Sequence, residues 1–346
     1  MIQAESQNYL LPVGLPLTAG GLLMHAEIAY DAYGSPSAGA PIVLLHDITS
    51  SHHALADPEP SLFKPSGWGL PWVGPGRVID PADHFILSPN LLGSPYGSTS
   101  PAKVGPDGVP MGTDFPSAST EDMARACAAL IRGIGLKSVR VVVGVGLGGM
   151  VALHLAALFP DLVRGVVALG ASARLPARIR DAYAKTRAVL EADPAFKQGA
   201  YFPGPAPLQA LKALRLDMLR DFYPKAALIE AHGEMAAGER RLESEAEAFA
   251  KQFDANAFAL LRGAYASCDL VPLLSRLTCR VLLVACSTDA YAPPIEVRGT
   301  YHSLMALGVR AHYYEFDSDR GRAGMLKDAP RLGGAIGEFL ATLGSA

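Results

Sequence analysis

Residues 139–159 read VRVVVGVGLGGMVALHLAALF, and this stretch decides the fold. It begins with β-branched residues, which are typical of a buried strand. Four glycines follow within six positions, and the remainder has the apolar pattern of a packed helix. A strand, a tight turn and a helix in this order form the element on which α/β proteins usually place their chemistry.

The glycine turn fits one known motif and fails another. Residues 144–149, GVGLGG, match the G-x-G-x-x-G of dinucleotide-binding domains. They fail the G-x-S-x-G nucleophile elbow because Gly146 stands where the serine should be. A dinucleotide motif, however, should lie in the first βαβ unit and be followed by an acid at the end of the next strand. Here the motif lies mid-chain and the next strand ends in LGASA, so a dinucleotide-binding oxidoreductase is kept only as an alternative.

Composition narrows the function classes. The chain has 346 residues, of which 50% are hydrophobic and 18% charged, with a net charge of −3. Such a charge gives no electrostatic case for binding nucleic acid or an anionic membrane surface. The four cysteines have no metal-like spacing, and the first residues show no signal-peptide pattern. We therefore expect reduced thiols and a cytoplasmic protein.

Strand and helix patterns divide the chain into two regions. Residues 1–171 and 271–346 alternate between short apolar runs and helical segments, which predicts an α/β core. Residues 172–270 show helical segments without a buried strand, which predicts an inserted helical lid. The predicted strands are an antiparallel hairpin over 10–33 and runs at 41–45, 84–88, 163–169, 280–285 and 312–316, and the main helices are 120–132, 179–192, 208–222 and 243–253.

Two loops are unusual. Residues 46–53, HDITSSHH, contain three histidines and an aspartate. Their spacing matches no recurrent ligand pattern, so we interpret the segment as a polar loop after a strand and expect no metal. Residues 61–115 are rich in Gly and Pro, and a loop of this length usually shapes a site.

With these loops in place, the chain resembles the homoserine O-acetyltransferase family of α/β-hydrolases over nearly its whole length. The resemblance implies a mostly parallel eight-stranded sheet flanked by helices, a helical lid after the sixth strand and a homodimer joined through that lid. Members of the family transfer an acetyl group from acetyl-CoA to the homoserine hydroxyl through an acyl-serine. The matching segments are His46-x-Ile48-Thr49, Gly74-Pro75-Gly76-Arg77-x-Ile79-Asp80, Asn90-x-Leu92-Gly93-x-x-Tyr96-Gly97-Ser98-Thr99, Asp114-Phe115-Pro116, Asp122-Met123-x-Arg125, Gly148-Gly149-Met150, Arg187 with Asp193-Pro194, Phe253-Asp254-Ala255-Asn256 and Asp289 with Pro293-Pro294.

The resemblance fails at the catalytic residues. The nucleophilic serine falls on Gly146, which cannot form an acyl-enzyme, and the catalytic histidine falls on Arg322, whose guanidinium is always protonated. Asp289 survives as the acid of the triad. The oxyanion-hole positions correspond to the backbone N–H groups of Ile48 and Leu147, which substitution does not delete. We therefore predict a degenerate triad and a pseudoenzyme.

A ligand role remains open for this centre. A glycine elbow leaves the N–H groups of a helix N-terminus unhindered, which favours an anion. Arg322 and Arg187, the latter a substrate-recognition position in the family, would frame a pocket for a small anionic molecule together with Asp47 and Thr49. Alternatively, one carboxylate neutralises Arg322 and leaves no room for a ligand.

Two other function classes stay open beside the non-catalytic one. An acyltransferase, hydrolase or lyase with rebuilt chemistry would use Asp47, Asp289 or Cys286, although a free cysteine is usually part of a core. His312 lies four residues before the end of its predicted strand, more than about 10 Å from the position of a catalytic base. A structural subunit that pairs with an active paralogue is the third class. No cofactor is expected.

Overall fold

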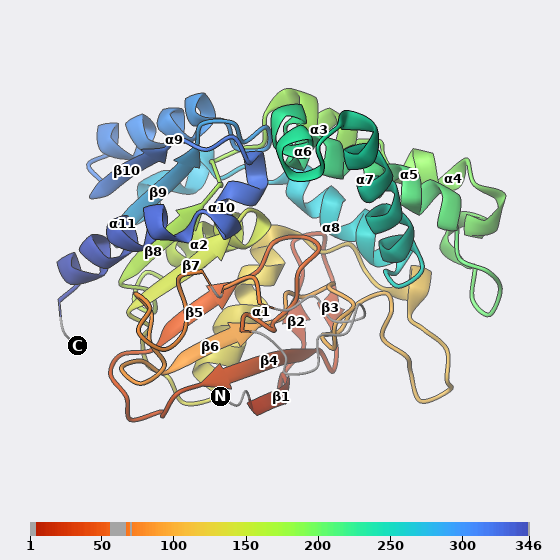
Figure 1. Ribbon diagram of the computed structural model, residues 1–346. Helices are drawn as coiled ribbons and strands as arrows, with labels where there is room; N and C mark the ends of the chain where they lie inside the picture. Colours follow the sequence, from red (N-terminus) through yellow and green to blue (C-terminus); the bar gives the residue numbers. More distant parts are fainter. Residues whose placement is uncertain (1–4, 56–66, 70, 345–346) are drawn as a thin grey trace.

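The computed structural model describes residues 5–55, 67–69 and 71–344, so the first part of the Gly- and Pro-rich loop lies outside the described residues (Figure 1). Its centre is an eight-stranded sheet in the order β1-β4-β6-β5-β7-β8-β9-β10. All pairs from β6 to β10 are parallel, and β1 and β4 add an antiparallel edge. The strands are β1 (Glu5–Leu10), β4 (Glu27–Tyr33), β5 (Ile42–Leu45), β6 (Ile86–Pro89), β7 (Val141–Val145), β8 (Gly165–Leu169), β9 (Arg280–Cys286) and β10 (Ala311–Phe316), while β2 (Leu15–Pro16) and β3 (Leu22–Leu23) form a separate pair. The predicted mostly parallel, eight-stranded fold is confirmed.

Helices cover both faces of the sheet because the central strands are apolar on both sides. Val43 and Leu45 belong to the core beneath α1, α2 and α9, whereas Ile42 and Leu44 pack on the face covered by α11. Continuous apolar runs of this kind are typical of parallel strands buried on two faces. The helices of this part are α1 (Thr120–Gly133), α2 (Leu147–Leu158), α9 (Pro294–Ala306), α10 (Gly324–Lys327) and α11 (Ala329–Thr342), with short 3-10 turns η1 (Gly112–Asp114), η3 (Val271–Arg276) and η4 (Gly321–Ala323).

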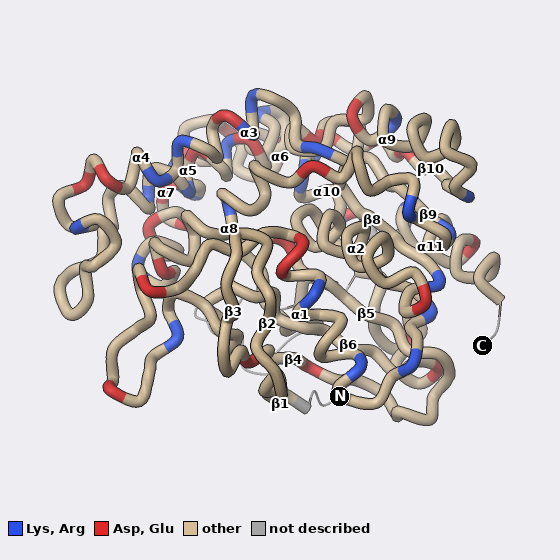
Figure 2. Tube along the Cα trace, turned by 180° about the vertical axis from the view of Figure 1, so that it is seen from behind, with Lys and Arg blue, Asp and Glu red and all other residues tan. Residues whose placement is uncertain are grey.

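Between β8 and β9, where every residue is described, the chain forms helices and no strand. We call α3–α8 the inserted helices; in Figure 1 they lie together at the upper right, beyond one end of the sheet. Figure 2 shows that these helices carry both acidic and basic residues. The inserted helices are α3 (Ala177–Ala184), α4 (Thr186–Glu191), α5 (Leu208–Phe222), α6 (Lys225–His232), α7 (Met235–Ala250) and α8 (Ala255–Ser267), with η2 (Pro194–Gly199) between α4 and α5.

Local boundaries differ from the sequence predictions in three places. The predicted helix over 179–192 is two helices that meet at Lys185. The predicted hairpin over 10–33 is wrong in its pairing, because β1 begins at Glu5 and pairs with β4 while a short β2–β3 pair lies between them. The helix predicted at 243–253 begins and ends earlier, as α7 (Met235–Ala250), whose first residues, MAAGERRL, show no clear apolar period. No described helix has the length and apolarity that crossing a membrane would require.

Candidate active site

The turn between β7 and α2 holds Gly146 in a conformation that favours glycine. Its φ is +56° and its ψ −114°, and it is the N-cap of α2. A Cβ built on Gly146 would lie less than 3.0 Å from Arg322 Nη2 and from both carboxylate oxygens of Asp47. A serine at this position therefore cannot coexist with the present arrangement of those two side chains.

The neighbouring glycines are explained by close packing of α2 on the sheet. A Cβ on Gly144 would collide with the backbone of Gly148, and a Cβ on Gly148 would collide with the backbone of Leu45. The match to a dinucleotide motif thus has a structural reason that involves no nucleotide.

Arg322 fills the space above the elbow. It belongs to η4, is 3% exposed, and forms ion pairs of 2.9 Å with Asp47 Oδ2 through Nη2 and with Asp289 Oδ2 through Nη1. The same guanidinium donates to the Gly170 carbonyl and to the Tyr265 hydroxyl. Burial alone would lower the pKa of Arg322, but the negative charges of Asp289 and Asp47 raise it well above its ordinary value. Arg322 is therefore a fixed cation and not a proton acceptor.

The two amides at the predicted oxyanion-hole positions are already occupied. Both Ile48 N and Leu147 N donate to Asp47 Oδ1, at 2.8 and 3.0 Å. Such donors stabilise an oxyanion that forms during acyl transfer. In this molecule one carboxylate oxygen of Asp47 accepts from both amides, while the other pairs with Arg322.

Asp289, the surviving acid, follows β9 and is almost fully buried. Its Oδ1 accepts from the backbone N–H groups of Tyr291 and Ala292, at 2.8 and 3.2 Å, while Oδ2 faces Arg322. The structure therefore brings Asp289, Arg322, Asp47 and Gly146 together, as the sequence predicted.

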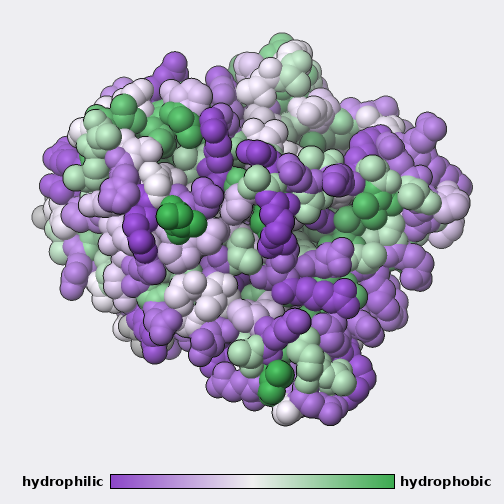
Figure 3. Space-filling view, turned by 90° about the horizontal axis from the view of Figure 1, so that it is seen from above, coloured by the Kyte–Doolittle hydropathy of each residue, from purple (hydrophilic) through white to green (hydrophobic). Residues whose placement is uncertain are grey.

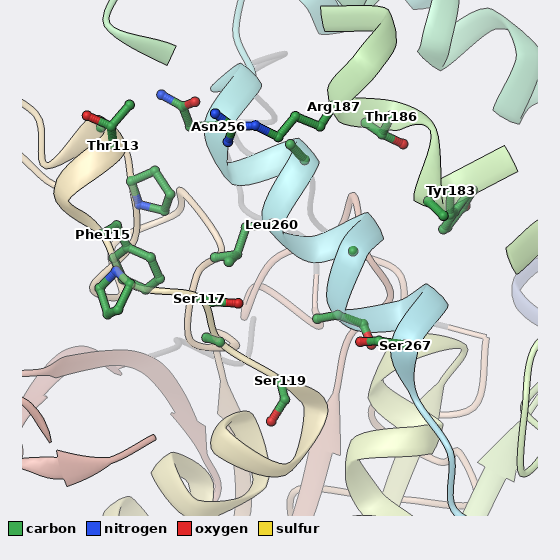
Figure 4. A pocket seen from close by; sticks show the side chains of 18 of the residues that line it. Thr113, Phe115, Ser117, Ser119, Tyr183, Thr186, Arg187, Asn256, Leu260 and Ser267 are labelled. Atoms are coloured by element: carbon green, nitrogen blue, oxygen red, sulfur yellow. The ribbon is translucent and has the colours of Figure 1, made fainter. Parts of the chain in front are cut away.

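Arg187 lies elsewhere. It is on α4 with a side chain that is 57% exposed, and its Nε pairs with Glu191 at 2.9 Å. It lines a cavity of about 490 Å³ between α8 and the segment around residues 112–119. Figure 4 shows Arg187 extending across one end of this cavity toward Asn256. Among the described residues no contact joins Arg187 to Arg322, so the two arginines predicted to share an anion have separate partners.

Several residues near the centre escaped the sequence analysis. Thr49 Oγ1 accepts from Arg215 Nη1 at 3.3 Å, and Arg215 also pairs with Glu245 on α7 at 3.0 Å. Arg262 on α8 is 3% exposed, and its guanidinium carbon lies 4.0 Å from the centroid of the Tyr183 ring. Periodicity alone assigns such residues to a helix face and cannot show that they close over the elbow. Arg262 gave a signal as the single charged residue of α8, since a buried arginine requires partners, whereas Arg215 lies among other charged residues of α5.

The histidine loop is mainly structural. His46 is fully buried, with Nδ1 bonded to the Asp47 carbonyl and Nε2 accepting from Leu91 N. Within the described part of the chain, Asp31, His52 and His53 form the group that could hold a metal ion, with ligand atoms within 4.8 Å of one another. His53 Nδ1 lies 2.9 Å from Asp31, so a direct hydrogen bond accounts for this pair.

The other candidates for rebuilt chemistry, Cys286 and His312, are poorly placed to act as a nucleophile or a base. Cys286 is buried at the end of β9, and burial raises the pKa of its thiol, which disfavours the nucleophilic thiolate. His312 is the second residue of β10, and its ring lies 5.9 Å from that of Phe339 on α11. All four cysteines are buried and unpaired.

Comparisons with known proteins agree with this geometry. The family model described as alpha/beta hydrolase fold matches residues 41–322. The homoserine O-acetyltransferase of Caulobacter vibrioides is 31% identical over 354 aligned residues, covering 95% of this chain and 92% of the relative. The homoserine O-acetyltransferase of Symbiobacterium thermophilum is 30% identical with the same coverage.

Solved structures share the fold. The crystal structure of esterase E22 has a TM-score of 0.87 at 20% identity and covers 98% of this chain and 100% of its own. The homoserine O-acetyltransferase from Bacillus anthracis has a TM-score of 0.87 at 21% identity and covers 98% of both chains. Together with the sequence relatives, these matches decide against the dinucleotide-binding alternative. This chain belongs to the homoserine O-acetyltransferase family within the α/β-hydrolase fold.

Proposed function

We propose that this chain is a homoserine O-acetyltransferase-like pseudoenzyme, in which Gly146 and Arg322 replace the serine and histidine of the triad. The observation that supports this most directly is the position of Asp47. One of its carboxylate oxygens takes both amides that would stabilise an acyl-transfer intermediate, and the other pairs with Arg322. Nucleophile, base and oxyanion hole are then lost together.

Rebuilt chemistry is the weaker candidate. A nucleophilic or basic group must be free to react, but Asp47 and Asp289 both face Arg322, and the pKa of the Cys286 thiol is raised by burial. Neither carboxylate is available without breaking a buried ion pair.

The direct test is turnover. The purified chain is incubated with acetyl-CoA and homoserine, and free CoA is measured against an active member of the family. We expect at most a small residual rate, far below that of the active member, because triad enzymes that lack these groups keep only residual catalysis. A rate of about 1 per second or more, ordinary for enzymes, would show that the proposal is wrong.

The proposed ligand is a small anionic molecule, bound at the cavity that Arg187 lines and not at the amides of the elbow. Arg187 is a cation in that cavity, while hydroxyl and amide side chains such as Thr113, Ser117 and Asn256 add hydrogen-bonding groups. These are suited to a carboxylate that carries a hydroxyl or amino group. Titration calorimetry with 4-hydroxybutyrate, a hydroxycarboxylate anion, is expected to give binding that Arg187→Ala weakens about tenfold or more and that Arg180→Ala, on the neighbouring α3, leaves unchanged. Equal affinities in the two variants would contradict this site.

We also propose a homodimer joined through the inserted helices, which would form the lid over 172–270. Exposed apolar side chains on this part support it, among them Val189, Phe202, Leu208 and Ile229. Obligate dimer faces bury about 2,000 Å² or more in total. Light scattering at micromolar concentration is expected to give twice the chain mass, and a monomeric mass would contradict the dimer.

A further inference from the structure

A second cavity lies behind the segment that carries Arg322. Its volume is about 260 Å³, and it is lined by α6 and α7 on one side and by residues 320–327 on the other. In both Figure 1 and Figure 2 the helices α6 and α10 lie near each other, at the junction between the inserted helices and the sheet. Figure 3 looks down on this face, where hydrophilic residues cover much of the surface.

The cavity is basic, although the whole chain is slightly acidic. Arg241, Arg320, Lys327 and His232 line it, with Glu245 as the single carboxylate among its lining residues. Cations from two distant parts of the sequence therefore converge on one small space. We call this cavity the basic pocket.

Within the described part of the chain, some charged side chains of the basic pocket form ion pairs, whereas those of Arg241 and Lys327 do not. Glu245 pairs with Arg215, and Arg320 pairs with Asp328 at 3.3 Å. No ion pair among the described residues involves Arg241 or Lys327. The Nζ of Lys327 lies 5.3 Å from the centroid of the Tyr223 ring. Two positive charges therefore face a cavity whose one carboxylate is paired with Arg215, and neither has a direct ion pair of its own to any residue that the structure describes, the opposite of the situation at Arg322.

We propose that the basic pocket binds a phosphate group of a small soluble molecule. A guanidinium and an ammonium that face one space supply the charge-assisted hydrogen bonds that phosphate oxygens accept. The Tyr223 hydroxyl, which also lines the pocket, adds a neutral donor. The small volume suits a phosphate group better than a large ligand. This inference is independent of the pseudoenzyme proposal, since none of these residues contributes to the centre at Gly146.

The test is calorimetric titration of the full chain with inorganic pyrophosphate, with sulfate titrated in parallel. We expect one saturable site per chain and tighter binding of pyrophosphate than of sulfate. Arg241→Ala and Lys327→Ala should each weaken binding about tenfold or more, because each removes a hydrogen bond to a charged group. Arg240→Ala is the matched control: it is the neighbouring residue of α7, pairs with Glu234 and does not line the pocket.

Four results would overturn the proposal. The first is the absence of saturable binding, and the second is an Arg240→Ala variant that loses as much affinity as Arg241→Ala. The third is co-sedimentation with vesicles that contain phosphatidic acid while free pyrophosphate does not bind, since that result would assign the pocket to a lipid headgroup. Circular dichroism of each variant checks that the fold is intact. Binding that survives in the Arg241→Ala, Lys327→Ala double variant would also contradict the site.

Discussion

Arg322 and the basic pocket lie on opposite sides of one short segment and handle positive charge in opposite ways. Arg322 is enclosed, and two carboxylates of the same chain take its hydrogen bonds. Arg241 and Lys327 are exposed and have no such partner among the described residues. The difference teaches where a ligand can bind: a buried cation whose hydrogen bonds are taken by the protein itself is structural, whereas an exposed cation can still reach a ligand.

The largest effect that separates the two regions is expected on removal of the buried guanidinium. Arg322→Met leaves Asp47 and Asp289 as unpaired charges in the interior, and such a break lowers the free energy of unfolding by about 3–5 kcal/mol. Urea denaturation followed by circular dichroism measures the change. The control is Arg241→Met, which should shift it by no more than about 0.5 kcal/mol. Equal losses in the two variants would remove the distinction.

The second-largest loss of stability is expected when a side chain is placed in the space above Gly146. Gly146→Ser places a side chain at a positive φ and into contact with Arg322 and Asp47, so we expect a loss of about 2–4 kcal/mol in the free energy of unfolding. Adding Arg322→His opens the space, so the double variant should lose less than the sum of the single losses. A double-mutant cycle by urea denaturation measures this coupling. Additive losses would mean that the two sites do not compete for the same space.

A buried group without a full counter-charge should instead stay neutral, and His46 tests this. Burial lowers the pKa of His46 to about 4, against the opposing charge of Asp47. The unfolded chain, with a histidine pKa near 6.5, then binds the proton more readily than the folded one. Stability is complete above pH 6.5 and falls toward pH 4, by up to about 1.4 kcal/mol for each pH unit.

The measurement for His46 is the free energy of unfolding at pH 7.5, 5.5 and 4.5 in the wild type and in His46→Asn. The variant should show a smaller difference between pH 7.5 and 4.5. His312→Asn, which alters an exposed histidine, is the control and should retain the wild-type dependence. An unchanged pH dependence in His46→Asn would show that His46 is not the group responsible.

The smallest effect is expected in the basic pocket itself. Because Arg241 and Lys327 are exposed, replacing both by alanine should change the free energy of unfolding by no more than about 0.5 kcal/mol without added anion. Pyrophosphate should raise the Tm of the wild type and leave that of the double variant unchanged, because a ligand stabilises only the state that binds it. Equal Tm shifts would place the anion elsewhere.

The sequence predicted the fold and the neighbourhood of the centre because both depend on local patterns. The apolar runs predicted the parallel strands, and the helix predicted at 120–132 begins after Ser119, which caps α1 together with Asp122. The loop positions after β5, β7 and β9 meet because the carboxyl ends of parallel strands lie at one edge of the sheet.

The contacts of Asp47 and Arg187 depend on the direction of their side chains, which the spacing of residues in a sequence does not predict. Asp47 turns back so that Oδ1 reaches the amides of Ile48 and Leu147, which the sequence analysis did not predict, while Oδ2 neutralises Arg322, as its alternative stated. Arg187 turns toward Glu191 on its own helix, an i,i+4 pair that competes with any distant anion. The basic pocket joins α7 to residues 320–327, so its cations are adjacent only after folding.

The close packing at Gly144 and Gly148 has a consequence for the history of the centre. Because both glycines are required for α2 to lie against the sheet, the main chain at Gly146 is shaped by its neighbours and not by any reaction. Selection for folding alone would therefore preserve the elbow, whether or not the centre catalyses a reaction. Descendants of this chain would keep the backbone conformation of the elbow, and substitutions of the surrounding side chains alone could change what the centre binds or catalyses.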